Sequence, residues 1–205
     1  MRILLPFLCL LSPAALTAQV IDSQVPRPVA PFVVGGACPF ECCRLGEWTI
    51  GERAVLRALP SRVARPVGEV APGVRIRADT SLVVVSRLGL VVVKRAYREA
   101  EFGLRLSKGD SLIVLDYLGE GTTRVWWHGQ LALVFMFWDE AAMGHATGAK
   151  LVRPAIREWW ARVAWRDAAG THAGWLEATR YRVDGTDACS GSLSGQGRAP
   201  RSDPS

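Results

Sequence analysis

Residues 159–166 read Trp-Trp-Ala-Arg-Val-Ala-Trp-Arg, and apolar and polar positions alternate along most of this stretch. Successive side chains of a β-strand point to opposite faces of its sheet. One face of a strand here would carry the apolar residues Trp159, Ala161, Val163 and Trp165. The other face would carry Trp160, Arg162, Ala164 and Arg166. A shift of one residue would expose the first set to water, so the pattern predicts a strand with a well-specified register.

Further strands are predicted on the N-terminal side of this one. Apolar runs, many of them β-branched, occupy residues 81–86, 90–94, 111–118, 125–128 and 131–138. We expect Arg87-Leu88-Gly89 to form a compact turn and Gly129-Gln130 to join a hairpin. Helical periodicity is weak throughout, and only residues 97–106 and 141–156 offer room for a helical turn. Many short strands at close spacing predict an all-β sandwich or small barrel.

The two ends of the chain are expected to lie outside the folded body. Residues 1–18 carry one early cation, Arg2, then an apolar run and small residues before a cleavage position after Ala18. This layout is typical of a secretory signal peptide, and the apolar run is too short for a stable membrane span. Residues 19–37 read as an extended lead segment, and we expect the polar tail 190–205 to be disordered. The sequence thus predicts export to the periplasm or the extracellular space.

Four cysteines remain after cleavage: Cys38, Cys42, Cys43 and Cys189. An even number of cysteines in an oxidising compartment predicts disulfides, and the sequence alone allows three pairings. A bond between adjacent Cys42 and Cys43 would be strained, so we favour a short loop closed by Cys38. The remaining N-terminal cysteine would then bind Cys189. The alternative is a zinc site in the same cluster, but the paired Cys-x2-Cys spacing of structural zinc sites is missing, and we expect no metal.

Positive charge is the main compositional feature of the chain. Lysine and arginine number 25 against 19 acids, the net charge is +6, and only Lys94, Lys108 and Lys150 are lysines. Cationic proteins adhere to acidic surfaces such as phospholipid head groups, teichoic or uronic polymers, or nucleic acid. Export makes nucleic acid the least suitable of these partners. The cations are scattered singly, which argues against a polybasic run.

Few residues suggest catalysis. His128 and His172 fall at a strand end and in a turn, and His145, between two glycines, is the best candidate for a catalytic base. The chain has no His-Glu-x-x-His motif, no Gly-x-Ser-x-Gly elbow and no phosphate-binding glycine loop. Asp139 and Glu140 are adjacent, so on a strand their carboxylates diverge and cannot face each other as an acid–base pair. We expect neither an enzyme nor a cofactor.

Three short motifs resemble the bacterial SH3-like domain family. Residues 106–115 hold a Lys-Gly-Asp turn before an apolar strand, residues 160–163 read Trp-Ala-Arg-Val, and residues 174–176 read Gly-Trp-Leu. The family shows such a turn, a Trp-x-x-Val strand and a closing Gly-Trp-Val strand in this order. The resemblance implies a small, strongly bent β-barrel of an exported protein that engages cell-wall peptide or glycan. Two features depart from the family: a long insertion at 119–158, and Leu176 in place of valine.

The resemblance also implies a division of the folded body. Residues 99–189 would form an SH3-like domain that carries 119–158 as a β-hairpin insertion. Residues 38–98, with Trp48 and several short apolar runs, would form a second and fainter SH3-like domain. Residues 37–48 are similar to the opening of exported bacterial proteins that pair a cysteine-rich start with SH3-like repeats. We expect one or two small barrels cross-linked by disulfides.

Tryptophan is abundant, with eight residues in the chain. Trp126 and Trp127 are neighbours, as are Trp159 and Trp160, so on a strand each pair sends one ring to each face. Aromatic rings beside arginines suit stacking on sugars or gripping of peptides. The alternative is that a second buried face covers both rings without any ligand.

These observations predict a non-catalytic protein that binds peptidoglycan peptide or glycan at the cell envelope. We expect a groove with an aromatic floor and a cationic rim. The floor would be Tyr117, Trp126, Trp160 and Trp175, and the rim would be Arg162 and Arg166. The alternative is an adaptor or assembly component that pairs an envelope protein with an exposed strand edge, for which the apolar run 131–138 is the candidate.

Overall fold

The computed structural model describes residues 24–98, 102–136, 138–139 and 148–189, which form strands, turns and irregular segments. The chain is all-β, as predicted. The predicted signal peptide 1–18, the tail 190–205 and His145 lie outside the described residues. Within the described ranges no helix is long and apolar enough to cross a membrane.

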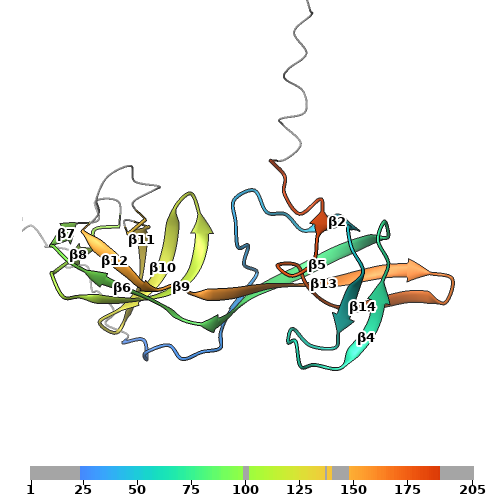
Figure 1. The fold of residues 1–205 in the computed structure, drawn as a ribbon, viewed down its shortest axis with the longest axis horizontal. Helices are drawn as coiled ribbons and strands as arrows, with labels where there is room; N and C mark the ends of the chain where they lie inside the picture. Colours follow the sequence, from blue (N-terminus) through green and yellow to red (C-terminus); the bar gives the residue numbers. More distant parts are fainter. Residues whose placement is uncertain (1–23, 99–101, 137, 140–147, 190–205) are drawn as a thin grey trace, which may run out of the picture.

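Two main sheets lie at opposite ends of an elongated molecule (Figure 1). The strands of the first, the large sheet, are β1 (Phe32–Gly35), β2 (Gly46–Ile50), β3 (Ala54–Arg57), β4 (Pro66–Val70), β5 (Arg75–Arg87), β13 (Ile156–Asp167), β14 (Gly170–Glu177) and β15 (Val183–Asp184). The strands of the second, the small sheet, are β6 (Gly89–Val93), β9 (Ser111–Gly119), β10 (Thr122–Trp127), β11 (Gln130–Phe135) and β12 (Ala149–Arg153). A separate pair is formed by β7 (Tyr97–Arg98) and β8 (Arg105–Leu106).

The order of strands mixes distant parts of the chain. The large sheet runs β15-β2-β5-β13-β14-β3-β4, and β1 also pairs with β5. The small sheet runs β11-β10-β9-β6-β12 and curls around its own core. The pairs between named strands are antiparallel throughout the described residues.

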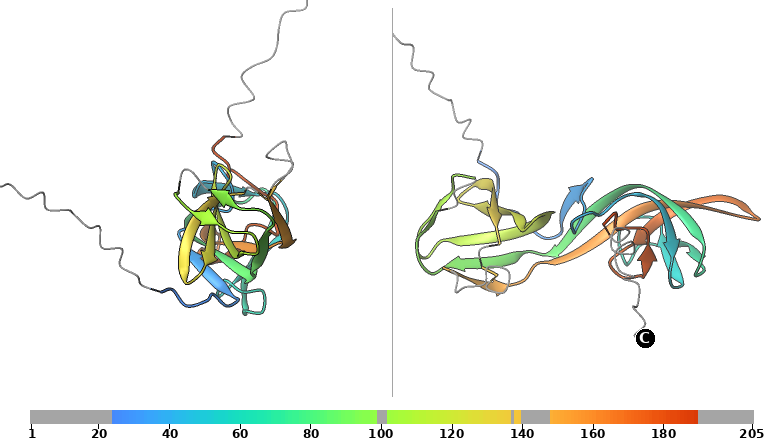
Figure 2. Two further views of the ribbon diagram at one scale, coloured as in Figure 1. Left: turned by 90° about the vertical axis from the view of Figure 1, so that its left-hand side faces the viewer. Right: turned by 90° about the horizontal axis from the view of Figure 1, so that it is seen from above.

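Two long strand pairs join the sheets. Only Leu88 separates β5 from β6, and only Pro154 and Ala155 separate β12 from β13. Arg87 lies opposite Ile156, and Leu90 lies opposite Arg153, so the ladder resumes directly beyond the break. Figure 2 shows the two continuous segments, β5 with β6 and β12 with β13, running from one end of the molecule to the other.

The compact turn predicted at Arg87-Leu88-Gly89 is therefore wrong. The chain continues in the same direction, because β6 pairs with β9 and β12 and does not fold back on β5. Gly89 suits this crossing point, since a Cβ there would lie 2.8 Å from Val114 Cβ and 3.0 Å from the Ala155 nitrogen. A turn signal read locally cannot reveal which partner a strand will find.

The strand pairing divides the chain differently from the expected boundary at residues 98 and 99. The large sheet takes its strands from both 32–87 and 156–184, and the small sheet takes its strands from 89–153. Residues 119–158 are no appended hairpin, because they supply three of the five strands of the small sheet and the start of β13. The hairpin itself is confirmed as β10 and β11, with His128 and Gly129 at its turn, one residue earlier than predicted.

The alternation at 159–166 is confirmed on its apolar face. Trp159, Ala161, Val163 and Trp165 are all buried in the core of the large sheet. The ring of Trp159 lies 5.2 Å from that of Trp48 and 5.5 Å from that of Phe40, centroid to centroid. A second core fills the concave side of the small sheet; its buried members include Val91, Leu112, Val125, Val134 and Trp138.

Two disulfides close one short loop and one long loop of the chain. Cys38 is bonded to Cys43, and Cys42 is bonded to Cys189, with Cα atoms 5.8 and 5.6 Å apart. The short loop lies between β1 and β2, which follow each other along the same edge of β5. The long loop attaches the C-terminal strand region to that edge, where Cys43 also forms a bridge with Asp187.

The lead segment is tied to the fold along its described length. The nitrogen of Val25 donates to the carbonyl of Gly129, and Phe32–Gly35 pair with β5 as β1. The segment is extended, as expected, and it runs from the small sheet to the large one (Figure 2).

Candidate binding face and cavity

The groove predicted from the sequence is not assembled as one surface. Tyr117 and Trp126 belong to β9 and β10 of the small sheet. The other four predicted residues, Trp160, Arg162, Arg166 and Trp175, belong to β13 and β14 of the large sheet. The six predicted residues are therefore divided between two sheets and do not form one groove.

Tyr117 and Trp126 are already engaged by other parts of the chain. The Tyr117 hydroxyl donates to Glu41 Oε1 at 2.7 Å and accepts from the Gly121 nitrogen at 3.0 Å. Burial, followed by the hydrogen bond to Glu41, raises the pKa of Tyr117. The indole nitrogen of Trp126 donates to the carbonyl of Val25 at 2.9 Å. These two rings hold the cysteine loop and the lead segment against the small sheet.

Trp160 is buried, with 1% of its surface exposed, so its predicted place in a binding floor is wrong. Its indole nitrogen donates to Glu158 Oε2 at 3.2 Å, and its cross-strand neighbours are Leu82 and Glu177. Arg62, from the loop between β3 and β4, donates from Nε to both oxygens of buried Glu177 and lies 3.6 Å from Glu158. The loop thus covers this part of the sheet, which is the alternative that the sequence had left open.

Arg162 and Trp175 remain as a pair on the outer face of the large sheet. They lie directly opposite each other on β13 and β14, so both side chains leave the same face. Paired residues of neighbouring strands continue this row on both sides. Arg57 of β3 lies opposite Trp175, and Thr80 of β5 lies opposite Arg162. Trp175 is half-buried, and Arg162 is exposed. Trp175 therefore lies between two arginines in a row across three strands.

Three further arginines share this outer face. Arg77 lies opposite Ala164, and Arg75 is two residues before it on β5, while Arg166 is at the end of β13. We call the set the arginine face: Arg57, Arg75, Arg77, Arg162 and Arg166. Within the described part of the chain none of the five forms an ion pair. Glu47 of β2 lies opposite Arg77 and adds a negative charge to this face, and Asp184 of β15 lies opposite Thr49.

Arg57, Arg75 and Arg77 are not among the residues predicted from the sequence. The alternation Arg-Ile-Arg-Ala at 75–78 is a signal for two of them, because Ile76 and Ala78 are buried and both arginines are exposed. The pairing of β5 with β13 places these arginines beside Arg162, and no local pattern contains that pairing.

Of the two described histidines, His128 lies in the turn between β10 and β11, whereas His172 lies in β14, so its predicted place in a turn is wrong. His172 Nε2 lies 2.8 Å from Asp167 Oδ1, and its ring stacks on Trp165 at 4.9 Å. The hydrogen bond with His172 is the main cause that lowers the pKa of Asp167. His128 Nε2 lies 3.5 Å from Asp110 Oδ1. Among the described residues, no hydrogen bond joins either histidine to a hydroxyl or thiol side chain.

A metal-like grouping occurs at the cysteine cluster. One donor atom each from Cys42, Asp187 and Cys189 lies within 4.8 Å of the others. The two sulfur atoms are bonded to each other, so neither is a thiolate that could ligate an ion. The grouping is explained by the disulfide.

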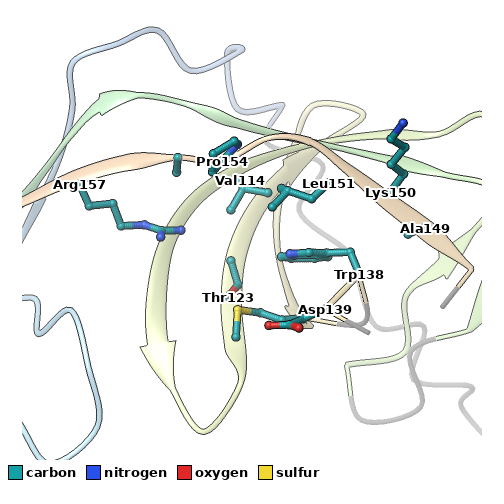
Figure 3. Close-up of a pocket in the computed structure, with 11 residues that line it drawn as sticks. Val114, Thr123, Trp138, Asp139, Ala149, Lys150, Leu151, Pro154 and Arg157 are labelled. Atoms are coloured by element: carbon teal, nitrogen blue, oxygen red, sulfur yellow. The ribbon is translucent and has the colours of Figure 1, made fainter. Parts of the chain in front are cut away.

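An open cavity of about 560 Å³ lies at the small sheet (Figure 3). Its lining comes from β9, β10, β12 and the start of β13, together with Trp138 and Asp139 after β11. The residues that line it are Val114, Thr123, Met136, Trp138, Asp139, Ala149, Lys150, Leu151, Pro154, Ala155 and Arg157. No local sequence pattern predicts this cavity, because its walls come from segments whose pairing is non-local.

A buried carboxylate lies close to the cavity. Asp116 is 1% exposed, and its Oδ1 lies 3.7 Å from Arg124 Nη1, too far for a hydrogen bond. Neither of its oxygens accepts a hydrogen bond from the described residues. Burial raises the pKa of Asp116, against the opposing charges of Arg124 and Arg157.

Comparison of the chain with family models, with curated proteins and with solved structures finds no match. The SH3-like resemblance therefore stays a prediction.

Proposed function

We propose that the chain is an exported, non-catalytic binding protein of the cell envelope, and that its arginine face holds an acidic envelope polymer. Peptidoglycan is the first ligand class, because its stem peptides carry carboxylates beside the rings of amino sugars. The pair of disulfides supports export, since disulfides persist in oxidising compartments.

The row Arg57–Trp175–Arg162 is the observation that carries this proposal. A half-buried indole offers an apolar surface on which a sugar ring can stack, and guanidinium groups bind carboxylates with two parallel hydrogen bonds. Arg57 Nη1 donates to the carbonyl of Ala64, which orients its side chain at one end of the row. Arg162 has no ion-pair partner among the described residues and is available to a ligand.

A single contact of this kind is weak. An exposed ion pair contributes about 0–1 kcal/mol, and an aromatic contact adds roughly 0.5–1.5 kcal/mol. A polymer that repeats the same groups can engage several arginines at once, and linked contacts strengthen one another by effective concentration. The spread of arginines over β5 and β13 fits a repeating ligand better than a small molecule.

Co-sedimentation with purified peptidoglycan sacculi over a salt series tests the proposal. We expect oxidised protein without residues 1–18 to pellet, and to keep part of its binding when salt screens long-range charge. Trp175→Ala should weaken the salt-resistant part by about fivefold, the factor that roughly 1 kcal/mol represents. Arg162→Gln should weaken binding at low salt as well. The matched control is Arg105→Gln, an exposed arginine of β8, which should change neither.

Wild-type pelleting by both Trp175→Ala and Arg162→Gln would contradict the assignment to this face. Pelleting that disappears at moderate salt and falls equally in the Arg105→Gln control would reduce the interaction to general cationic adhesion.

A second candidate function is the adaptor, and strand edges favour it. The small sheet ends at β11 on one side and β12 on the other. Leu131 of β11 is 44% exposed, and Leu151 and Val152 of β12 are also exposed. Long apolar edges tend to pair with another strand. A sedimentation coefficient that rises with protein concentration would support this function, and a constant monomer value would count against it.

A further inference from the structure

The cavity of the small sheet is a second feature with the dimensions of a binding site. Its volume of about 560 Å³ falls within the range of roughly 300–1,000 Å³ typical of small-molecule pockets. It lies beside the crossing from β12 to β13, and its residues are not those of the arginine face.

One part of the cavity is apolar. Val114, Met136, Trp138 and Ala149 form this part of the lining. The ring of Trp138 faces the space from the side opposite Arg157 (Figure 3). Trp138 is 9% exposed, so its ring is held by the core and does not need to reorganise for a ligand. An apolar body of modest size would gain contact with this wall by leaving water.

The other part of the cavity carries a guanidinium group. The Arg157 side chain reaches into the space from the start of β13 (Figure 3). Its Nε donates to the carbonyl of Leu115 at 3.0 Å, and no hydrogen bond of the described residues uses its two terminal nitrogens. Arg157 is half-buried, and its burial lowers the pKa of the guanidinium group. The anchored Nε fixes the group while its outer edge stays available.

Arg157 is the cation that faces the cavity. Lys150 also borders it, but its side chain points away from Trp138 and Arg157, and Asp139 supplies a negative charge on the Trp138 side (Figure 3). Asp116 attracts Arg157 from outside the lining, but it makes no ion pair with it. The hydroxyl of Thr123, also in the wall, has no hydrogen-bond partner among the described residues. An anionic group with acceptor oxygens would match the unused donors of Arg157 and Thr123.

We propose that this cavity binds a small amphipathic monocarboxylate, with its apolar body against Trp138 and Met136 and its carboxylate on the terminal nitrogens of Arg157. A carboxylate fits the planar edge of a guanidinium group with two parallel hydrogen bonds, which a neutral or cationic head group cannot do. An aliphatic acid of about ten carbons is small enough to enter a cavity of this volume.

Titration with decanoate, followed through the indole N–H signal of Trp138 in a ¹H–¹⁵N spectrum, tests the proposal. We expect a saturable shift of that signal with decanoate, and binding weaker by about tenfold for decan-1-ol, which has the same chain and no charge. Arg162→Gln on the arginine face should leave decanoate binding unchanged. An unshifted Trp138 signal, or equal binding of acid and alcohol, would overturn the proposal.

Two substitutions at one exposed position test the charge of the cavity without touching Arg157. Leu151 lines the cavity and is 40% exposed on the edge strand β12, so it can be changed with little risk to folding. Leu151→Glu should weaken decanoate binding by about tenfold, because a carboxylate at this position repels the carboxylate of decanoate, and Leu151→Lys should retain it. Arg157→Gln should abolish the preference for acid over alcohol. Equal affinities of Leu151→Glu and Leu151→Lys for decanoate would contradict the assignment.

Discussion

Trp48 and Trp159 pack against each other with ring centroids 5.2 Å apart, although they come from the two ends of the folded body. Their strands, β2 and β13, lie on either side of β5 in the large sheet. Both rings are almost completely buried. This contact packs together two parts of the large sheet that are far apart in the sequence. β2 comes before all the strands of the small sheet in the chain, and β13 comes after them.

Trp159→Ala should cost about 3–5 kcal/mol in the free energy of unfolding, the usual range for removing a buried aromatic side chain. Trp175→Ala, at a half-buried position on the outer face, should cost clearly less, about 1 kcal/mol. Denaturant unfolding of the oxidised proteins measures both values. A loss for Trp175→Ala as large as for Trp159→Ala would show that the outer face is part of the core.

Gly89→Ala should destabilise the protein by about 1–3 kcal/mol, as overpacking does elsewhere. The added Cβ would meet Val114 and the backbone of Ala155 at the crossing between the sheets. Gly35→Ala in β1 is the matched control, since a Cβ there meets no atom within 4 Å. Thermal unfolding should separate the two variants, and an unchanged melting temperature for Gly89→Ala would mean that the crossing is loosely packed.

Asp116→Asn should become more stable relative to the wild type as pH rises. Burial raises the pKa of Asp116 in the folded protein. The folded state then holds this proton more tightly than the unfolded state does. The resulting stability is complete below the unfolded pKa and is lost as pH rises through the folded pKa. Asparagine carries no such proton, so the difference in Tm between variant and wild type should grow from about pH 3 to about pH 7.

The control for this pH series is Asp167→Asn, whose effect should have the opposite sign. The hydrogen bond with His172 lowers the pKa of Asp167, so its contribution is present above the unfolded pKa and is lost as pH falls. This variant should lose stability relative to the wild type as pH rises. Parallel trends for the two variants would contradict the buried state of Asp116.

Removal of the Cys42–Cys189 bond should cost more than removal of the Cys38–Cys43 bond. The first closes a separation of 147 residues and the second a separation of 5. In the chain-entropy model these loops contribute about 5 and about 2 kcal/mol. Unfolding of the two double serine variants, Cys42→Ser with Cys189→Ser and Cys38→Ser with Cys43→Ser, gives the comparison. Equal losses would mean that the long loop does not restrict the unfolded chain.

Much of the local structure could be predicted from the sequence, and much less of the candidate site. The strand at 159–166, the apolar strand after Lys108-Gly109-Asp110 and the hairpin near Gly129 all follow from local alternation and turn chemistry. The predicted groove mixes residues of two sheets, because a local pattern does not show which sheet a strand joins. The burial of Trp160 could not be predicted for the same reason. The loop that covers it carries Arg62, which is far from Trp160 in the sequence.

The sequence by itself determined that the chain is all-β, which face of β13 is buried, and that its cysteines can form one short and one long loop. Those properties depend on the alternation of side chains within one strand and on the number and spacing of the cysteines, and both can be read directly from the sequence. Only the tertiary structure decided that β5 pairs with β13, that Leu88 continues one strand into the next sheet, and that Arg57, Trp175 and Arg162 form one row. Backbone hydrogen bonds between strands are much the same for any sequence, so the choice of partner depends on how whole faces pack together. A local pattern does not contain that information.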